Sequence, residues 1–462
     1  MFKQVITDRR RTLREWKRIF SLGWPISTQT FVRTGMRTTD VFVAGLFGPA
    51  ALAALGLANL YSRVALYTGI GIGTGSLALA SQDTGSGADA NRDQAITQAI
   101  IIGFLIGIPF AVLAYLFSDN AIRLLGAPSE VVTLGAAYLA LVLGTAPFRH
   151  ITLTGEKSLQ GTGDTITPMF IRGGSNVLNI IGTVVLGLGI GPAPRLEVVG
   201  IGLATAGANI VAGLAVIFVF MTSISEVNLV RPKNFIIAKQ IIVISIPRTT
   251  EGLATTVASF PIEAILVMFG VEIYAAYTVG RQVRSQLTSP FARSFGVIGS
   301  ILTGQSLGEE NIQESHFNIA ALTALCLLIV VSLSIIMFTW NEFFASLFSD
   351  DTATAEAAQT FILVFAIVSP IEALFRTYSG ALQGAGETTK PLIAELTGVF
   401  GLFLGITYIG GVLMGGGVTL VYVAIICYHF WRFGLIFYWY SQDFWIQNAI
   451  QQLEARGSIG SD

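Results

Sequence analysis

Residues 25–45 read PISTQTFVRTGMRTTDVFVAG and place ionisable side chains inside a segment that is otherwise apolar or small. Gln29, Arg33, Arg37 and Asp40 recur at steps of four, four and three residues, so a helix would present all of them on one face. A charge at the centre of a bilayer costs about 2.5 to 3.5 kcal/mol, so this face must line a protein interior or a water-filled cavity. The segment therefore predicts a membrane helix with a functional polar face, and Asp40 is its main candidate. The alternative is that Arg37 and Asp40 only neutralise each other in a structural ion pair.

The whole composition indicates a protein embedded in a membrane. Of 462 residues, 53% are hydrophobic and 12% are charged, and the mean hydropathy of +0.68 is higher than a soluble domain with a hydrated surface reaches. The 50 glycines fit this class, because small residues let membrane helices approach one another closely. Cys326 and Cys427 both lie in apolar runs, so neither a disulfide framework nor a thiolate metal site is expected.

Twelve apolar stretches of the sequence are each long enough to cross about 30 Å of hydrocarbon. The sequence therefore predicts an all-α polytopic membrane protein with twelve transmembrane helices. Lysines and arginines are concentrated before the first stretch and in every second connection after it, whereas the other connections hold only Arg123 and Arg195. By the positive-inside rule both termini are cytoplasmic, and we expect a multi-pass protein of the cell (plasma) membrane.

The two halves of the chain repeat each other at a spacing of 222 residues. Pro25 matches Pro247, and with one residue of slippage LQGTGDTITP at 159–168 matches LQGAGETTKP at 382–391. We interpret this as an internal duplication into two six-helix bundles, related by a pseudo-two-fold axis along the membrane normal. Pro25 and Pro247 are expected to kink their helices and act as hinges, and the LQG motif is expected to form a turn between two helices.

The duplication predicts the limits of the parts of the chain. The linker is expected where Pro232 and several cations interrupt the apolar pattern. The predicted parts are a cytoplasmic N-terminal segment at 1–18, an N-terminal bundle at 19–223, a cytoplasmic linker at 224–239, a C-terminal bundle at 240–440 and a cytoplasmic tail at 441–462.

Several longer stretches resemble the multidrug and toxic-compound extrusion (MATE) family of secondary transporters. They are TDVFVAGLFGPAALAALGLANLYSRV from residue 39, GSLALASQDTGSGADANRDQA from 75, AAYTVGRQVRSQLTSPFARSFG from 275, TGQSLGEEN from 303, and LQGxG[DE]TxxxP in both halves. The resemblance covers about residues 20 to 440 and is closest to the archaeal and DinF-like branch. It implies two bundles that rock around a central cavity and expel organic compounds in exchange for protons or Na⁺. Neither enzyme activity nor a cofactor is expected, apart from Na⁺ as an alternative coupling ion.

For cation coupling, the resemblance implies an acid in the first span and a run of the form NxxNxxxD in the fifth. Asp40 matches the first, and NVLNIIGT matches the second except that Thr183 stands in the place of the acid. Such a site offers Na⁺ one charge fewer than two carboxylates would. The candidate coupling residues are Asp40, Asn176, Asn179, Thr183 and Thr205.

A second set of residues is expected to line the substrate cavity. The bacterial branch of the family implies acids in the second half of the chain, which Glu372 and, with a poorer alignment, Glu251 would supply. Arginines inside the spans outnumber the acids there, and surplus guanidinium groups favour an anionic ligand, because their fork matches a carboxylate or a phosphate. The set is Gln29, Arg33, Arg37, Asn59, Arg63, Arg281, Arg284, Glu251 and Glu372.

Two hypotheses for the function stay open. The first is export of organic compounds from the cytoplasm by H⁺ or Na⁺ antiport, and the second is export of organic anions, or flipping of lipid-linked phosphates, through the intramembrane arginines. A receptor or a structural membrane protein agrees poorly with the duplicated halves. The expected partners are small organic substrates and the lipid bilayer, with no nucleic acid, and the chain is expected to act as a monomer.

Overall fold

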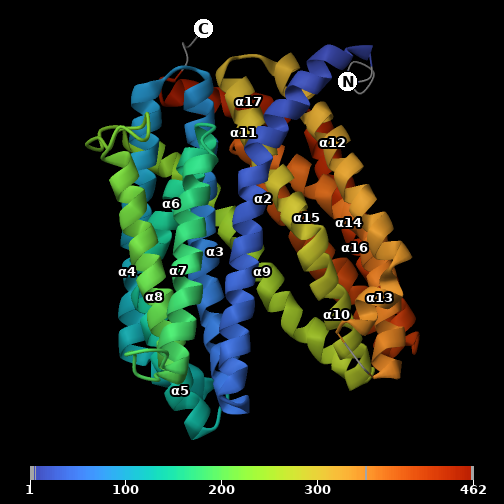
Figure 1. Cartoon of the computed structure of the whole chain (residues 1–462). Coiled ribbons are helices and arrows are strands. Elements are labelled where there is room, and N and C mark those ends of the chain that lie inside the picture. Colours follow the sequence, from blue (N-terminus) through green and yellow to red (C-terminus); the bar gives the residue numbers. More distant parts are fainter. Residues whose placement is uncertain (1–4, 6, 349–350, 459–462) are drawn as a thin grey trace. The chain divides into compact units, whose positions relative to one another are not determined.

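The computed structural model describes residues 5, 7–348 and 351–458, and this part of the chain is helical and contains no strand. The chain divides into two compact units, which we call the N-terminal unit and the C-terminal unit. The N-terminal unit comprises Thr28–Thr249 and residues 455–458, and the C-terminal unit comprises Thr250–Glu454 and the described residues up to Ser27. Figure 1 shows the helices of both units, coloured along the sequence.

Six helices lie wholly within the N-terminal unit, where α7 packs along α8 and α3 packs along α6 (Figure 1). They are α3 (Pro49–Gly85), α4 (Asp89–Leu124), α5 (Ser129–Gly144), α6 (Ala146–Gly161), α7 (Ile166–Leu188) and α8 (Glu197–Phe220). The helical elements wholly within the C-terminal unit are α10 (Val271–Leu287), α11 (Ser289–Gly308), α12 (Ile312–Thr339), α13 (Asn341–Ser346), α14 (Thr352–Gly384), α15 (Thr389–Leu396), the π-helices η1 (Thr397–Leu404) and η2 (Ile406–Leu413), and α16 (Gly417–Ser441). The last helix, α17 (Phe444–Ala455), ends where the chain returns to the N-terminal unit.

Two long helices, α2 (Arg9–Leu46) and α9 (Phe235–Met268), pass from one unit to the other. Residues 9–18 of the predicted N-terminal segment thus continue into the first span as one helix. In both helices the change of unit comes two residues after the matched proline, Pro25 in α2 and Pro247 in α9. A proline inside a helix leaves one backbone carbonyl without its donor, so these are the positions at which each helix bends most easily.

The structure also explains why hydropathy alone understates the number of spans. Within the described residues, nine helices are long and apolar enough to cross a membrane, and α5 with α6, bent by 48°, makes a tenth. The two missing spans are α2 and the broken pair α10 and α11, both of which carry intramembrane arginines. With these two, the helices form the twelve spans that the sequence predicts.

The repeated LQG motif forms the same turn in both halves. Gly163 has φ 96° and Gly386 has φ 82°, a region that residues with a Cβ rarely adopt. The acid that follows each glycine caps the next helix: Asp164 Oδ1 accepts from the backbone N–H groups of residues 166 and 167 at 3.0 and 2.9 Å, and Glu387 Oε1 accepts from those of 389 and 390 at 2.9 and 3.2 Å. The motif is therefore a structural turn.

Small residues bring the helices of the N-terminal unit close together. A Cβ on Gly71 of α3 would lie 2.1 Å from Thr249 Oγ1, and one on Gly75 would lie 2.8 Å from the carbonyl of Ile241, both in α9. No side chain fits between these backbones, so α3 and this part of α9 pack in direct contact. The core of the C-terminal unit is instead rich in aromatic side chains such as that of Phe317, which is 1% exposed.

Candidate functional site

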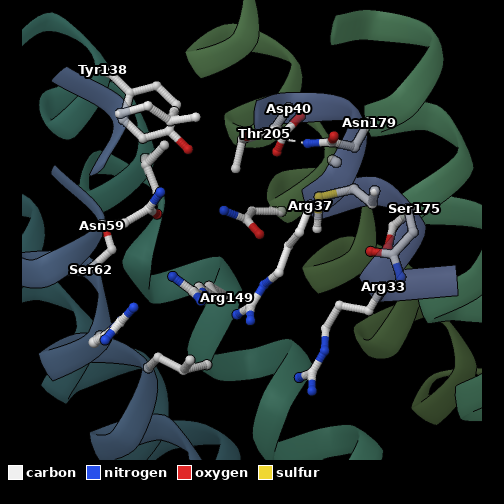
Figure 2. A pocket seen from close by; sticks show the side chains of 18 of the residues that line it. Arg33, Arg37, Asp40, Asn59, Ser62, Tyr138, Arg149, Ser175, Asn179 and Thr205 are labelled. Atoms are coloured by element: carbon white, nitrogen blue, oxygen red, sulfur yellow. Dashed lines mark hydrogen bonds between the residues drawn. The ribbon is translucent and has the colours of Figure 1, made fainter. Parts of the chain in front are cut away.

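A cavity of about 250 Å³ lies inside the N-terminal unit and is lined by side chains of α2, α3, α5, α6, α7 and α8 (Figure 2). Its lining is unusual for a membrane interior, because ionisable and amide side chains alternate with apolar ones. The polar lining residues are Arg33, Arg37, Asp40, Asn59, Ser62, Arg63, Tyr138, Arg149, Arg172, Ser175, Asn176, Asn179, Thr205 and Asn209.

Asp40 of α2 belongs to a compact group of polar side chains on this cavity, and it is 7% exposed. Thr183 of α7, at the position where the family pattern has an acid, donates its hydroxyl to Asp40 Oδ1 at 2.8 Å. The amide of Asn179 lies between Asp40 and Thr205, as Figure 2 shows. Four of the five predicted coupling residues therefore meet at one place, although their role in coupling stays a prediction.

The amide of Asn179 can serve either charge state of the carboxyl group beside it. With its nitrogen facing Asp40 Oδ1, it donates to the carboxylate at 3.2 Å and its oxygen accepts from Thr205 Oγ1 at 3.0 Å. In the opposite orientation its nitrogen donates to Thr205 Oγ1 at 3.0 Å, and its oxygen faces Asp40, where only a protonated carboxyl group could donate to it. The amide can thus face either charge state of Asp40, although only the first orientation also lets its oxygen accept from the backbone N–H of Thr205 at 3.3 Å.

Asn176, the fifth predicted coupling residue, lies one helical turn before Asn179 on α7 and also faces the cavity. It is 4% exposed, and its Nδ2 group has no hydrogen-bond partner among the described residues. A buried N–H donor without a partner costs about 1 to 3 kcal/mol, so an acceptor in the cavity would stabilise this arrangement.

Arginines from four helices line the same cavity. Arg172 of α7 forms an ion pair with Glu156 of α6, in which Nε lies 2.7 Å from Oε1. For Arg37, Arg63 and Arg149, the described residues provide no carboxylate within ion-pair distance. We call these three residues the arginine cluster.

Members of the arginine cluster act on one another through space. Arg37 is within electrostatic reach of Arg63 and of Asp40, and Arg149 is within reach of Arg37. In Figure 2 the side chain of Arg37 extends away from Asp40. Like charges held near one another in a poorly solvated cavity repel, so the cluster offers a strongly positive site for an anion.

The other predicted cavity residues lie elsewhere. Gln29 belongs to the N-terminal unit but does not line the cavity, and its Nε2 group finds no partner among the described residues. Arg281 and Arg284 belong to the C-terminal unit. There Arg281 Nη1 lies 3.0 Å from Glu263 Oε1, and Arg284 Nη1 lies 3.2 Å from His429 Nε2.

The two predicted acids of the second half belong to a buried charge network in the C-terminal unit. Glu372 accepts from Arg376 Nε at 2.8 Å and from Arg432 Nη2, and Glu251 Oε1 lies 3.9 Å from Arg376 Nη1. Arg432, which is 2% exposed, also donates to Glu395 Oε2 at 2.6 Å. This network holds three acids and two arginines, in contrast to the cavity of the N-terminal unit, where arginines outnumber the single acid.

The sequence interpretation missed several members of the cavity. Arg149 and Arg172 are among the arginines inside the spans, but nothing in their spacing assigns them to a site. A signal for Arg149 was available, because it comes shortly after Thr145 and Pro147, at which the fourth span breaks into α5 and α6. Discontinuous helices at membrane depth often mark binding sites.

A sequence model of the MatE family matches residues 25–185 and 242–409, which is most of the chain. The chain belongs to the MatE family. Among the relatives of this MatE chain, the multidrug resistance protein NorM of Vibrio cholerae serotype O1 is 24% identical, over 82% of this chain and 84% of that protein. The FAD transporter of Shewanella oneidensis is 25% identical, over 86% of this chain and 89% of that protein.

Solved structures agree with the fold of this MatE chain. A MOP superfamily transporter from Pyrococcus furiosus, described as having a binding pocket of reversed polarity, superposes with a TM-score of 0.85 at 20% sequence identity, covering 94% of this chain and 97% of its own. The predicted family, the all-α fold with twelve spans in two bundles, and the role of a transporter rather than an enzyme are confirmed. The branch within the family stays a prediction.

Proposed function

We propose that this MatE chain is a cation-coupled secondary transporter that works by alternating access and carries a small organic anion. It acts as a single chain in the cell membrane with both termini in the cytoplasm. The anionic cargo binds to the arginine cluster, and the coupling cation binds at Asp40.

The observation that carries this proposal is the charge of the cavity in the N-terminal unit. Arg37, Arg63 and Arg149 line it without a carboxylate partner among the described residues, and Asn176 adds a buried N–H donor that has no acceptor. Guanidinium groups and amide donors match the oxygen atoms of carboxylate, sulfonate and phosphate groups. An organic cation would instead have to enter a cavity in which positive side chains outnumber negative ones.

The name of one similar protein supports an anionic cargo, and the description of another concerns the polarity of its pocket. FAD, the cargo named for the Shewanella relative, contains a negatively charged pyrophosphate. The Pyrococcus transporter is described by the reversed polarity of its pocket and by a different function that this polarity suggests. Each of these statements concerns the other protein, and we extend them to this chain because its own cavity carries the positive charges.

The polar group around Asp40 supports the coupling half of the proposal. Asp40, Thr183, Asn179 and Thr205 present oxygen atoms from three helices, and Asp40 supplies the one negative charge among them. Such a group can take up a proton on the carboxylate, or hold Na⁺ through several oxygen atoms. The two candidate ions are H⁺ and Na⁺.

A second candidate function is export of cationic drugs by antiport, and the name of the Vibrio relative favours it. In that case Asp40 would be the acid that a drug and the coupling ion occupy in turn. The alternative of a lipid-linked phosphate as cargo uses the same arginines as our proposal, and it differs only in requiring the lipid chain.

Transport by purified full-length protein in liposomes tests the proposed function. The probes are FAD, as a fluorescent organic anion, and ethidium, as a fluorescent organic cation. We expect FAD to be transported, and we expect Arg37→Gln combined with Arg149→Gln to reduce FAD transport at least tenfold. Arg195→Gln, which removes an arginine outside the cavity, is the matched control and should behave as the unmutated protein. Transport of ethidium but not of FAD would contradict the proposal and favour the drug antiporter.

A further inference from the structure

We infer that the coupling cation and the anionic cargo strengthen each other's binding, so that this protein moves them together in one direction instead of exchanging them. This inference rests on the proposed function, because it assumes that the cargo is an anion. It concerns the sign of coupling, which the likeness to other transporters does not determine.

The geometry that carries the inference is the position of Asp40 and the arginine cluster on one cavity. Arg37 and Asp40 lie three residues apart on the same face of α2, and both line the cavity together with Arg63 of α3 and Arg149 of α6. Asp40 is the one carboxylate among the lining residues. Its negative charge therefore partly offsets the cluster to which the cargo must bind.

The other charged or titratable groups that line this cavity include no second carboxylate. On α2 there is also Arg33, on α5 the neutral Tyr138, and on α7 Arg172, whose charge is already matched by Glu156 of α6. The part of α8 that lines the cavity consists of Thr205, Ala208 and Asn209, none of which is charged. The α4 helix contributes no lining residue.

The charge of Asp40 therefore sets the affinity of the cavity for an anion. While Asp40 is ionised, it attracts the same guanidinium groups that would bind the cargo and repels the cargo itself. A proton or Na⁺ on Asp40 removes both effects, which at the effective dielectric of a protein interior strengthens anion binding on the order of tenfold. The amide of Asn179 can face Asp40 with its nitrogen in one orientation and with its oxygen in the other, and Thr183 donates to Asp40 Oδ1, so the change of charge requires only that this amide turn over.

Thermodynamic linkage makes the effects of the cation and the anion on each other's affinity equal. If the cation increases the affinity for the anion by some factor, the anion increases the affinity for the cation by the same factor. Ligands that exclude each other can be exchanged by alternating access, whereas ligands that favour each other load together and cross together. With an anionic cargo, a cation gradient directed into the cell would therefore drive uptake of the cargo.

Equilibrium binding of a small anion with fixed charge tests the inference directly. The probe is naphthalene-1,5-disulfonate, whose fluorescence reports binding and whose sulfonates stay ionised at both mildly acid and mildly alkaline pH. We expect the full-length protein to bind it at least tenfold more tightly at the acid pH in the absence of Na⁺, or more tightly on adding Na⁺ in place of choline at the alkaline pH. Asp40→Asn should bind tightly and without dependence on pH or Na⁺, and Arg195→Gln should follow the unmutated protein.

A second measurement does not depend on any variant. In weakly buffered solution, adding the disulfonate to the unmutated protein should cause uptake of protons, or tighter binding of Na⁺ if that is the coupling ion. Affinity that is independent of both ions, or release of protons on binding, would overturn the inference and leave the anion site standing. No binding of the disulfonate at either pH, with or without Na⁺, would overturn the anion site and with it the proposed function.

Discussion

Thr183 donates its hydroxyl to Asp40 Oδ1 at 2.8 Å, across the contact between α7 and α2. A second acid at this position would face Asp40 as a like charge and would need a cation between the two carboxylates. A threonine instead stabilises a single carboxylate by one hydrogen bond and leaves the net charge of the cavity positive. This one difference from the pattern of the archaeal and DinF-like branch, which the sequence resembles, therefore agrees with the surplus of arginines that lines the same cavity.

We expect Thr183→Val to destabilise the protein by about 2 kcal/mol, because the buried carboxyl group of Asp40 loses a donor that valine cannot replace. The loss of stability should be larger at alkaline pH than at acid pH, because an ionised Asp40 depends on its hydrogen-bond donors. Thermal unfolding in detergent, followed by tryptophan fluorescence at both pH values, measures this. Thr133→Val is the control, since that exposed hydroxyl only bonds to a carbonyl of its own helix. Equal losses in the two variants would contradict the prediction.

The same substitution should destabilise the protein to different extents at two arginines of the cavity. Arg172→Gln leaves Glu156 without its partner in the interior, which costs about 3 kcal/mol or more of stability. Arg149→Gln removes a charge that has no carboxylate partner among the described residues and that is repelled by Arg37, so it should change stability by less than about 1 kcal/mol. Unfolding in denaturant or on heating separates the two, and similar destabilisation by both substitutions would show that Arg149 is paired after all.

Some of these cavity residues could be predicted from the sequence and others could not, and the difference has a physical reason. Spacing within one helix is fixed by its 3.6 residues per turn, so Arg33, Arg37 and Asp40 could be placed on one face before the structure was known, and all three line the cavity. The pairing of Arg172 with Glu156 joins two helices across a turn, and periodicity holds no information on which side chains meet there. The position of Arg149 depends in the same way on the bend of the fourth span.

The same limit applies to the larger organisation of the chain. The repeat of 222 residues predicted two bundles, and Gly48 with φ 101° and Gly270 with φ 130° occupy equivalent helix starts at that spacing. It did not predict that α2 and α9 would each belong to both compact units, nor that residues 455–458 would return to the N-terminal unit. There Arg456 Nε donates to Asp83 Oδ1 at 2.8 Å, and both side chains are fully buried. Contacts of this kind join residues that are hundreds of positions apart.

Outside the spans, Glu15 should make the stability depend on pH. Burial raises the pKa of this carboxyl group, the cation of Arg18 at 3.8 Å acts against that shift, and the nearby Glu314 adds to it. The folded state therefore holds the proton more tightly than the unfolded state, so stability is fully present at acid pH and falls as the pH rises above the ordinary range of a glutamate. We expect Glu15→Gln to unfold at a higher temperature than the unmutated protein at neutral pH and at the same temperature at acid pH. Glu356→Gln, which alters an exposed glutamate, should show no such dependence of the unfolding temperature on pH relative to the unmutated protein.

The last prediction links Asp40 to the bending of α2. The helix changes from the C-terminal to the N-terminal unit two residues after Pro25, which removes one backbone donor from this turn. A cation on Asp40 alters the attraction of this residue to Arg37 and its hydrogen bonds to α7. If this changes the free-energy difference between two bent forms of α2 by about 1.4 kcal/mol, the ratio of their populations changes tenfold. We expect spin labels at residues 20 and 46, in a background without Cys326 and Cys427, to give two distances whose populations change with pH. Pro25→Ala should suppress the change, and one distance distribution that is independent of pH in the unmutated helix would refute the hinge even if Asp40 proves essential for transport.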